Sequence, residues 1–395
     1  MSVTIKARRI FTPYVVIDNG TIVVEEGKIA YVGKNTKKAY TEEFLEFPNG
    51  ICIPGFIDLH VHGGGGGDFS DGTSESFTKA CIYHAKGGTT SILATLTTEP
   101  FDQIIRVLKE ARHWIKGKTL GAEVIGVHVE GPFLNPEMSG AQPTEYLEVP
   151  KSELIETLLE YSDVIKRVTI APELKYALDA IKLLSRYGIL CSIGHSKAHY
   201  DIVERALLVG LKHATHLYNA MGRAYKKGPY RIPGTLESVL SLDGITAEII
   251  ADGHHVHPAL IRMAIKAKGY ENVCLVTDAM RAAGMPDGTY RLGSIKYGTK
   301  VIVKNGISYT EDMRSFASTT ITMIDAVRTM IEIGYPPRLV FAMASTIPAK
   351  IIGISHKKGS IKVGLDGDIV VLDKDLKVLL TMVKGKIVYQ AECIT

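Results

Sequence analysis

Eight short apolar runs recur between residues 53 and 279, and segments with helical periodicity separate them. In chain order the runs are IPGFIDLHVH, TTSILATLT, EVIGVHVEG, VTIAPE, LCSIGH, HATH, AEIIAD and CLVTDA. Strands that read as nearly continuous apolar runs, and that alternate with helices, indicate a parallel sheet buried on both faces. Eight such units predict an α/β fold, a closed (β/α)₈ TIM-like barrel.

The intervening segments carry apolar residues three and four apart, which is the period of an amphipathic helix. Residues 101–116 show this pattern, and SELIETLLEYS repeats it with an N-cap candidate at Ser152. The pattern returns in PALIRMAIKAKG, where Pro258 stands at a first-turn position that tolerates proline. Further helices are expected over ALDAIKLLSRYG, YDIVERALLVG, residues 320–333 and residues 337–352.

The two ends of the chain have a different pattern, in which apolar and polar residues alternate. Residues 3–50 alternate around turn signals at Asp18-Asn19-Gly20 and Glu26-Gly27, and residues 359–390 around a turn near Lys384-Gly385. Each end holds too few strands to be stable alone, so the two are expected to pair into one small β-sandwich. The predicted organisation places 1–52 and 357–395 in this sandwich and 53–356 in the barrel.

Charge and cysteine content narrow the setting in which the chain works. The net charge of +4 is spread without basic blocks, which argues against a nucleic-acid partner. The start, MSVTIKARRIFTPY, lacks the apolar core of a signal peptide, and no run approaches the length of a membrane span. These features predict a cytoplasmic protein with no membrane partner. The five cysteines are scattered along the chain and are expected to be reduced thiols: Cys52, Cys81, Cys191, Cys274 and Cys393.

Residues that bind metals or transfer protons stand at the carboxyl ends of five runs. They are His60, His62, Glu130, His195, His216 and Asp278. Because the strands of a barrel carry reactive groups at their carboxyl ends, these side chains are expected to converge. His60 and His62 lie two apart on a strand and point to the same face. Glu130, His195 and His216 form a two-histidine, one-carboxylate set with room for water, which suits Zn²⁺ or Fe²⁺.

Asp278 has two interpretations. As an isolated aspartate that follows a strand, it would cap the next helix. Beside a metal held by the adjoining strands, its carboxylate would face the bound water, take its proton and deliver it to a leaving nitrogen. The neighbouring metal-ligand candidates favour this second role.

Several motifs carry a family resemblance. PGFIDLHVHGG resembles the first-strand signature of the amidohydrolase superfamily. Over nearly the full length, the chain is similar to the family of N-acetylglucosamine-6-phosphate deacetylases within it, through HVEGPFLNPEMSGAQP, SIGHSKA, HATHLYNAM, IADGHHVHP and VTDAMRAAGMPDGTYRLG. The resemblance implies hydrolysis of the acetyl group of N-acetyl-D-glucosamine 6-phosphate, which yields D-glucosamine 6-phosphate and acetate in amino-sugar catabolism.

The resemblance also implies the roles of the metal ligands. The matches to the principal metal site, at which a divalent ion is expected, are Glu130, His195 and His216. His60 and His62 match positions that hold a second metal in some relatives, so a second site is open.

Two further matches concern the reaction itself. Asp278, in VTDAM, matches the catalytic acid-base. His255, the second histidine of ADGHH, matches a residue that contacts the substrate and polarises its carbonyl. Such a histidine would stabilise the negative charge that develops during amide hydrolysis.

Other matches line the substrate: Ala141 and Gln142 in GAQP, Asn219 and Ala220 in LYNAM through their backbone, and the turn Phe316, Ala317 and Ser318. Gln142 stands where many relatives have histidine, so it can donate a hydrogen bond but carries no charge. Arg231, in RIPG, matches an arginine that binds the phosphate in the neighbouring subunit, which implies a homodimer. The preceding GRAYKKGPY is longer than in most relatives, and Arg223, Lys226 or Lys227 could share this role.

Three other functions remain open at this point. The same ligands could serve a deacetylase of the galactosamine epimer, or a cyclic amidase of the superfamily. Cyclic amidases usually bridge two metals through a modified lysine, a place that Glu130 fills here. The third alternative is a metal-free binding protein on an inherited barrel, against which the intact set of ligands argues.

Overall fold

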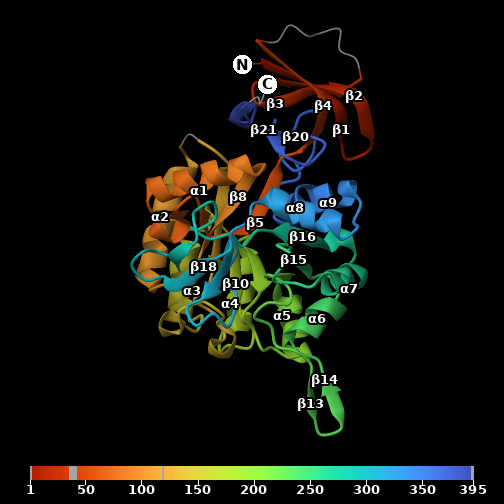
Figure 1. Cartoon of the computed structure of the whole chain (residues 1–395). Helices are drawn as coiled ribbons and strands as arrows, with labels where there is room; N and C mark the ends of the chain where they lie inside the picture. The colour runs from red at the N-terminus through yellow and green to blue at the C-terminus, as the bar shows by residue number, and fades with distance from the viewer. Residues whose placement is uncertain (1, 35–41, 118–119, 393–395) are drawn as a thin grey trace.

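The computed structural model of the chain describes residues 2–34, 42–117 and 120–392, and its centre is a barrel (Figure 1). Eight parallel strands form one sheet in the order β16-β15-β12-β11-β10-β9-β8-β5. All eight overlap the apolar runs, so the predicted TIM-like barrel is confirmed. They are β5 (Phe56–Val61), β8 (Thr89–Leu96), β9 (Glu123–Glu130), β10 (Ile165–Ile170), β11 (Leu190–Ile193), β12 (Leu211–Ala214), β15 (Thr246–Ile250) and β16 (Val273–Val276).

The barrel closes between β5 and β16, the two ends of this strand order. The amide of Asp278 donates to the carbonyl of His60 at 2.8 Å. The buried carboxylate of Asp58 accepts from the amide and the hydroxyl of Thr277, at 3.3 and 2.5 Å. The closure therefore places Asp278 directly beside the histidines of the first strand.

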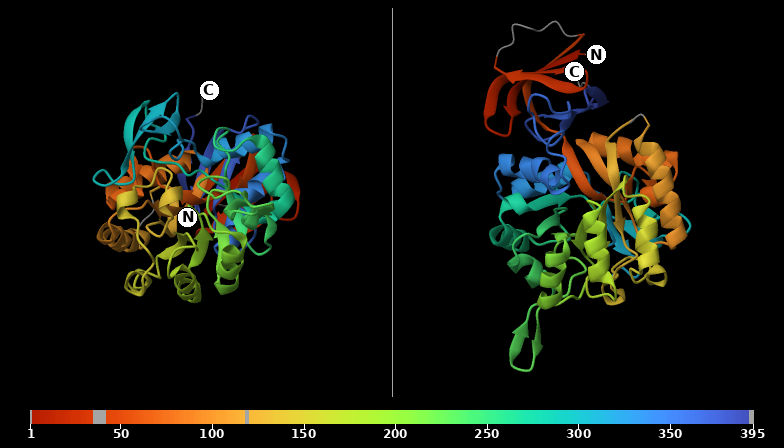
Figure 2. Two further views of the ribbon diagram at one scale, coloured as in Figure 1. Left: turned by 90° about the horizontal axis from the view of Figure 1, so that it is seen from below. Right: turned by 180° about the vertical axis from the view of Figure 1, so that it is seen from behind.

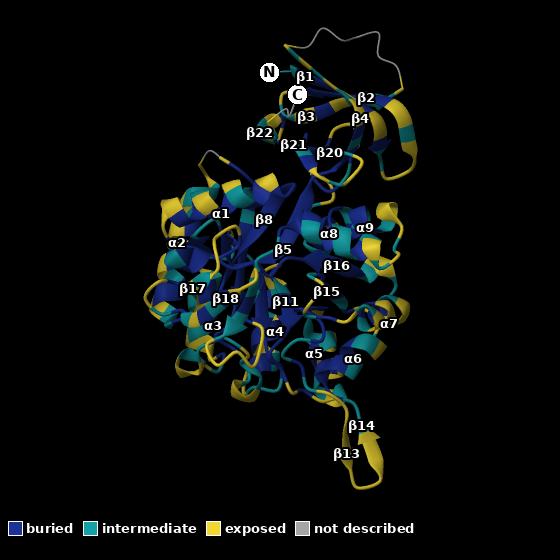
Figure 3. Ribbon diagram, viewed as in Figure 1, coloured by how far each residue is buried: buried dark blue, intermediate teal, exposed yellow. Residues whose placement is uncertain are grey.

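The helices surround the barrel and bury their apolar faces against it (Figure 3). They are α1 (Ser74–Lys86), α2 (Phe101–Ile115), α3 (Ser152–Leu159), α4 (Ala177–Arg186), α5 (Tyr200–Val209), α6 (Thr235–Ser241), α7 (Pro258–Lys268), α8 (Met323–Glu332), α9 (Pro337–Met343) and α10 (Thr346–Ile351). Pro258 opens α7, as predicted.

Two helix predictions need correction. Ser152 is the first residue of α3, and the N-cap is Lys151, whose side chain makes no capping hydrogen bond. The single helix expected over 337–352 is two helices, α9 and α10, because Ser345 between them leaves the helical region (φ −140°, ψ −71°).

Strands from both ends of the chain form one seven-stranded sheet in the order β22-β21-β20-β4-β1-β2-β3. They are β1 (Ser2–Phe11), β2 (Val16–Glu25), β3 (Lys28–Gly33), β4 (Glu43–Pro54), β20 (Ile369–Leu372), β21 (Val378–Val383) and β22 (Lys386–Gln390). The predicted turn at Asp18-Asn19-Gly20 is wrong. These residues lie inside β2, paired with β1, and the chain reverses between Thr12 and Val15 instead.

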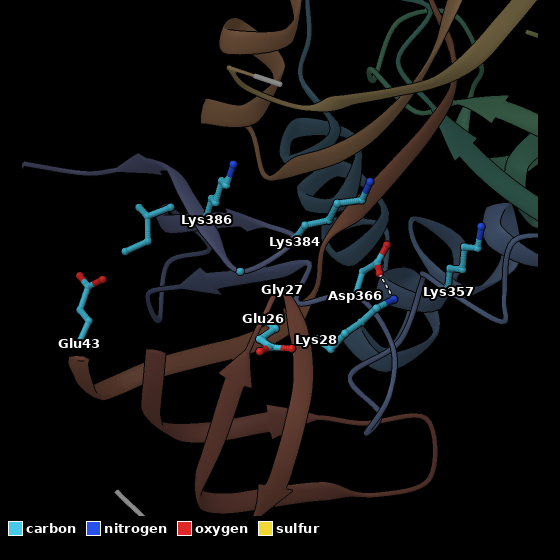
Figure 4. Close-up of a pocket in the computed structure, with 10 residues that line it drawn as sticks. Glu26, Gly27, Lys28, Glu43, Lys357, Asp366, Lys384 and Lys386 are labelled. Carbon is cyan, nitrogen blue, oxygen red and sulfur yellow. Dashed lines mark hydrogen bonds and ion pairs between the residues drawn. The ribbon is translucent and has the colours of Figure 1, made fainter. Parts of the chain in front are cut away.

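The sheet curls so that its edge strand β3 returns to the segment before β20. The amide of Ile29 donates to the carbonyl of Leu365 at 2.9 Å, and Lys28 forms an ion pair with Asp366 (Figure 4). A cavity of about 810 Å³ opens beside this ion pair. The two chain ends thus pair as expected, in one curled sheet.

Three additions were not predicted. The sheet of β17 (Gly288–Leu292), β18 (Thr299–Lys304) and β19 (Ile307–Thr310) stands beside the barrel mouth, and the hairpin of β13 (Tyr225–Lys227) and β14 (Tyr230–Ile232) projects from the barrel (Figures 1 and 2). A small hairpin joins β6 (Gly63–Gly64) and β7 (Gly67–Asp68). The described residues also contain four short 3₁₀ helices: Phe69–Asp71, Pro136–Met138, Thr144–Tyr146 and Tyr270–Asn272.

Within the described ranges, no helix has the length and apolar character needed to cross a bilayer. The described cysteines Cys52, Cys81, Cys191 and Cys274 are buried free thiols. Cys393 lies outside the described residues.

Candidate metal centre and active site

Four imidazole rings converge on one carboxylate at the carboxyl ends of the barrel strands. Each ring presents its Nε2 atom to an oxygen of Glu130, at 3.4 Å for His60, 3.3 Å for His62, 3.3 Å for His195 and 3.2 Å for His216. All five side chains are at most 6% exposed. The structure therefore brings together every residue that was predicted as a metal ligand.

Hydrogen bonds on the far side of two rings orient them toward a metal. The Nδ1 atom of His195 lies 2.8 Å from the carbonyl oxygen of Met138, and that of His60 lies 2.6 Å from a carboxylate oxygen of Glu248. These oxygens only accept, so each Nδ1 carries the proton and each Nε2 offers a lone pair. Hydrogen bonds of this kind fix the ring orientation and the tautomer of histidine ligands in metal sites.

The donor atoms form two groups that share Glu130. One group is Glu130 with His195 and His216, and the other is Glu130 with His60 and His62. The Nε2 atoms lie only 3.0 Å apart in the first pair and 3.3 Å apart in the second. Nitrogen and carboxylate donors at such spacing suit a divalent cation. The residues present therefore fit one metal ion, and their arrangement accommodates a second.

The electrostatics of the centre also favour a cation. Burial alone would raise the pKa of Glu130, but the neighbouring histidines, His60 foremost, hold it well below its usual range. Burial alone would lower the pKa of His62, but hydrogen bonds with Asp278 and Glu130 raise it to about 9. The buried carboxylates thus require positive charge, which either protons on the rings or metal ions can supply.

Asp278 lies against the second pair of histidines. Its Oδ1 atom is 3.1 Å from Nε2 of His62 and 3.4 Å from Nε2 of His60, and the hydroxyl of Ser318 donates to it at 3.3 Å. Burial opposes ionisation of Asp278, but His60 and His62 lower its pKa below the usual value. The side chain is therefore an ionised carboxylate that faces the cavity, as a general base requires.

A cavity of about 450 Å³ opens above the metal-ligand cluster. Most of the residues predicted to bind substrate line it: Ala141, Gln142, Asn219, Ala220, His255, Phe316 and Ser318. Ala317 does not line it, because its side chain is buried against Met280 and Leu292. Arg231 does not reach it either, since it lies on the exposed hairpin strand β14. None of the described residues that line the cavity is lysine or arginine.

The amides of LYNAM are only partly available to a ligand. The amide of Asn219 already donates to the carbonyl of His216 at 3.0 Å, so the predicted backbone contact from Asn219 competes with this bond. The amide of Ala220 has no such partner among the described hydrogen bonds. Tyr218, which the sequence did not single out, lines the cavity beside them.

Backbone strain concentrates around the same cavity. Non-glycine residues adopt the left-handed region at His195 (φ 48°), His216 (28°), Tyr218 (81°), Ala220 (49°), Asp278 (49°) and Ser318 (58°). Each such residue costs on the order of 1–3 kcal/mol, and such residues persist where the surrounding structure fixes them, often at functional sites. The left-handed φ of Ser318 is one that glycine adopts without strain.

His255 is held in place by Asp252, at the end of strand β15. The ring Nδ1–H donates to Asp252 Oδ2 at 2.7 Å, and the His255 amide donates to Oδ1 at 2.8 Å. The ring of Phe316 lies 4.9 Å away, between centroids. These contacts leave Nε2 as the free nitrogen of a ring that lines the cavity. Asp252 closes the run AEIIAD, and its role was missed in the sequence.

Gln142 connects the cavity wall to the metal centre. Its Nε2 donates to Glu130 Oε2 at 2.8 Å, and its Oε1 accepts from the amide of Thr98 at 2.8 Å. The side chain is 7% exposed. Gln142 therefore orients the carboxylate that all four histidines share, in addition to lining the cavity.

Replacing Gln142 by leucine is expected to weaken metal binding by about 10- to 100-fold, the usual cost of losing a residue that hydrogen-bonds to a metal ligand. The leucine fills a similar volume but leaves Glu130 Oε2 without its donor. Competition with a chromophoric chelator measures the change. Gln103→Leu is the matched control, because Gln103 is equally buried and binds the carbonyl of Ser70, away from the centre. An unchanged affinity in Gln142→Leu would contradict the orienting role.

Two charged residues of the barrel interior were also missed. Arg167 on β10 and Glu248 on β15 are both fully buried and form an ion pair directly below the histidines. The available signal was a charged residue within an otherwise apolar strand, which is rare unless the charge is paired.

The fold and the site define a class of protein. A model of the amidohydrolase family matches residues 51–388, and the chain belongs to this family. It is 36% identical over 394 residues to the N-acetylglucosamine-6-phosphate deacetylase of Bacillus subtilis (strain 168), with 98% of this chain and 97% of the relative covered. It is 33% identical over 389 residues to the N-acetylgalactosamine-6-phosphate deacetylase of Escherichia coli O157:H7, with 98% and 99% covered.

A solved structure of an enzyme with the same name as the first of these relatives also matches this chain. The D267A mutant of the N-acetyl-D-glucosamine-6-phosphate deacetylase from Mycobacterium smegmatis, in complex with N-acetyl-D-glucosamine-6-phosphate, matches with a TM-score of 0.89. Sequence identity to that structure is 30%, and the match covers 98% of this chain and 100% of that chain. The similarity thus extends over the barrel and the small sheet domain together.

Proposed function

We propose that this chain is a metal-dependent deacetylase that hydrolyses N-acetyl-D-glucosamine 6-phosphate to D-glucosamine 6-phosphate and acetate. The observation that carries the proposal is the position of Asp278, whose carboxylate lies 3.1 Å from a histidine of the predicted metal-ligand cluster and lines a cavity of about 450 Å³. Relatives similar over nearly the whole chain have this activity by name.

We assign the principal metal to Glu130, His195 and His216, and a second metal to His60, His62 and the shared Glu130. Zn²⁺ and Fe²⁺ both suit these ligands. When bound, a divalent cation supplies Lewis-acid polarisation and makes water nucleophilic near neutral pH.

The protein groups then transfer the proton and stabilise charge. Asp278 takes a proton from the attacking water while the water oxygen forms the bond to the acetyl carbon. The ring of His255, which Asp252 orients through Nδ1, stabilises the negative charge that develops on the carbonyl oxygen. Asp278 returns the proton to the nitrogen as the carbon–nitrogen bond breaks, so that acetate and the free amine leave.

The phosphate of this substrate needs a cationic partner. Because the described lining of the cavity offers no lysine or arginine, we propose that the partner subunit of a homodimer supplies it. The hairpin of β13 and β14 supports this role, since it projects from the barrel and carries Lys226, Lys227 and Arg231 on exposed positions (Figure 3). We assign the phosphate contact to Arg231.

Arg231→Ala is expected to raise KM for the phosphorylated substrate by about 10- to 100-fold, because one charge-assisted hydrogen bond contributes about 1.5–3 kcal/mol. Turnover of unphosphorylated N-acetyl-D-glucosamine should not change. The variants Arg223→Ala, Lys226→Ala and Lys227→Ala serve as matched controls and test whether another basic residue makes the contact.

Mixed dimers test whether Arg231 acts across the subunit interface. A dimer of Arg231→Ala and Asp278→Asn chains combines, in one of its two sites, an intact Asp278 with an intact Arg231 from the partner. At substrate concentrations well below the KM of the Arg231→Ala variant, co-expression should therefore give more activity than either variant alone. The absence of this gain in isolated mixed dimers would contradict the contact between subunits.

The alternative substrate is the galactosamine epimer, because the chain is also similar to an N-acetylgalactosamine-6-phosphate deacetylase. Acetate release from both epimers, with a hydantoin beside them as a cyclic amide, separates the alternatives. Higher kcat/KM on the gluco epimer supports the proposal. Hydrolysis of the hydantoin without release of acetate would overturn it.

A further inference from the structure

Glu248 links two metal-ligand candidates from below the centre. It lies on β15 inside the barrel and is fully buried. Its Oε1 atom is 2.6 Å from Nδ1 of His60 and accepts from the amide of His216 at 2.9 Å. One carboxylate oxygen thus touches a ligand side chain of one predicted metal position and the backbone of a ligand of the other.

Arg167 holds the opposite oxygen of this carboxylate. Its Nη1 atom donates to Oε2 of Glu248 at 2.5 Å and to the carbonyl of Leu59 at 3.2 Å. Its Nε donates to the hydroxyl of Ser192, and its Nη2 to the hydroxyl of Thr215, both at 2.8 Å. The fully buried guanidinium therefore joins several barrel strands and fixes the orientation of Glu248.

We propose that the Arg167–Glu248 pair is a positioning pair that sets the tautomer of His60 and thereby controls whether the second metal position can be filled. The inference rests on the proposed function in one respect, the assignment of His60 as a metal ligand. Neither Arg167 nor Glu248 lines the substrate cavity.

The hydrogen-bond donors around Glu248 determine which nitrogen of His60 carries the hydrogen. An ionised carboxylate only accepts, and Oε1 of Glu248 faces both the ring of His60 and the amide N–H of His216. The ring must therefore carry its hydrogen on Nδ1, and its Nε2 lone pair points into the centre. The guanidinium of Arg167, 2.5 Å from Oε2, supplies the countercharge of this buried carboxylate.

Glu248→Gln inverts this arrangement at nearly constant shape. The amide has one accepting oxygen, and the charged guanidinium of Arg167 should capture it in preference to the backbone N–H of His216, so the amide NH₂ turns toward His60. A donor there forces Nδ1 to accept and moves the ring hydrogen to Nε2, which then cannot bind metal. Elemental analysis should show a fall from two metal ions per chain to one. Calorimetric titration should show second-site affinity lowered by at least about 10- to 100-fold.

The double variant Arg167→Met/Glu248→Gln distinguishes this role from a general need for packing. Without the guanidinium, the amide oxygen is free to turn back to the Nδ1–H of His60, so the second metal ion should return. Circular dichroism and thermal melting of each variant verify folding. A purely structural role predicts that the double variant binds no better than the single one, because it removes more native contacts.

Each outcome has one meaning. Glu248→Gln protein with two metal ions at wild-type affinity would overturn the role, as would loss of the second metal in both variants. Wild-type protein that binds a single metal ion would instead overturn the proposed second site, and with it this inference. The principal site should retain its metal in every variant, which shows that the centre itself is intact.

Discussion

The Asp278→Asn variant is expected to lose about 10²- to 10⁴-fold in kcat, the usual contribution of a general acid-base group. The amide keeps the shape of the carboxylate and can still accept from Ser318, but it cannot take a proton from water. KM should change little, because Asp278 faces the reacting atoms at the floor of the cavity. Acetate release at saturating substrate measures the effect, and elemental analysis must show wild-type metal content.

Asp287→Asn makes the same chemical change at an exposed position that does not line the cavity. Asp287 lies in the turn before β17 and accepts from the exposed amides of Asn305 and Gly306. Its variant should keep the wild-type kcat. An Asp278→Asn protein with full metal and normal turnover would show that another group transfers the proton.

The barrel could be predicted because its strands are buried on both faces and therefore read as apolar runs. The sheet of β17, β18 and β19 could not be predicted in the same way. Its small core includes Leu292, Val301 and Val303, which pack against Met280 and Ala282 from the loop after β16. That burial exists only after the barrel has formed, so the local pattern alone does not show it.

The misplaced turn at Asn19 has a local cause. Asn-Gly is the strongest short-range hairpin signal because both residues tolerate positive φ. Asn19 does adopt a positive φ of 49°, but within a continuous pairing of β1 with β2. The preference of asparagine for positive φ therefore predicted the backbone conformation of Asn19 correctly. The pairing of β1 with β2 nevertheless continues through this residue, so no turn forms there.

The predicted metal ligands could be recognised in the sequence because they stand at or just beyond the carboxyl ends of four strands, with His60 and His62 sharing one of them. Arg167 and Glu248 were hidden because each lies inside a strand, and the two neutralise each other across 81 positions of the chain. Only the closed barrel brings them within 2.5 Å, where Glu248 also contacts His60 and His216. Such charge pairs have no periodic signature.

Glu130→Gln is expected to abolish binding at both metal positions, whereas His60→Asn should remove only the second metal. The two variants should differ because both predicted metal positions share Glu130, whose oxygens lie within 3.4 Å of all four histidines. Losing an outer-shell partner costs about 10- to 100-fold in affinity, and losing this shared ligand should cost more than about 10²-fold at each position. Metal content and chelator competition measure both variants.

Glu99→Gln is the matched control for Glu130→Gln. Glu99 is also a buried glutamate just beyond a barrel strand, but it accepts from the amide of Ser294, so its amide variant should keep both metals. If Glu130→Gln retained one metal, Glu130 would be a ligand of a single position and the two histidine pairs would be independent. If it retained two, the four histidines would be sufficient to bind both metals, and Glu130 would not be a required ligand.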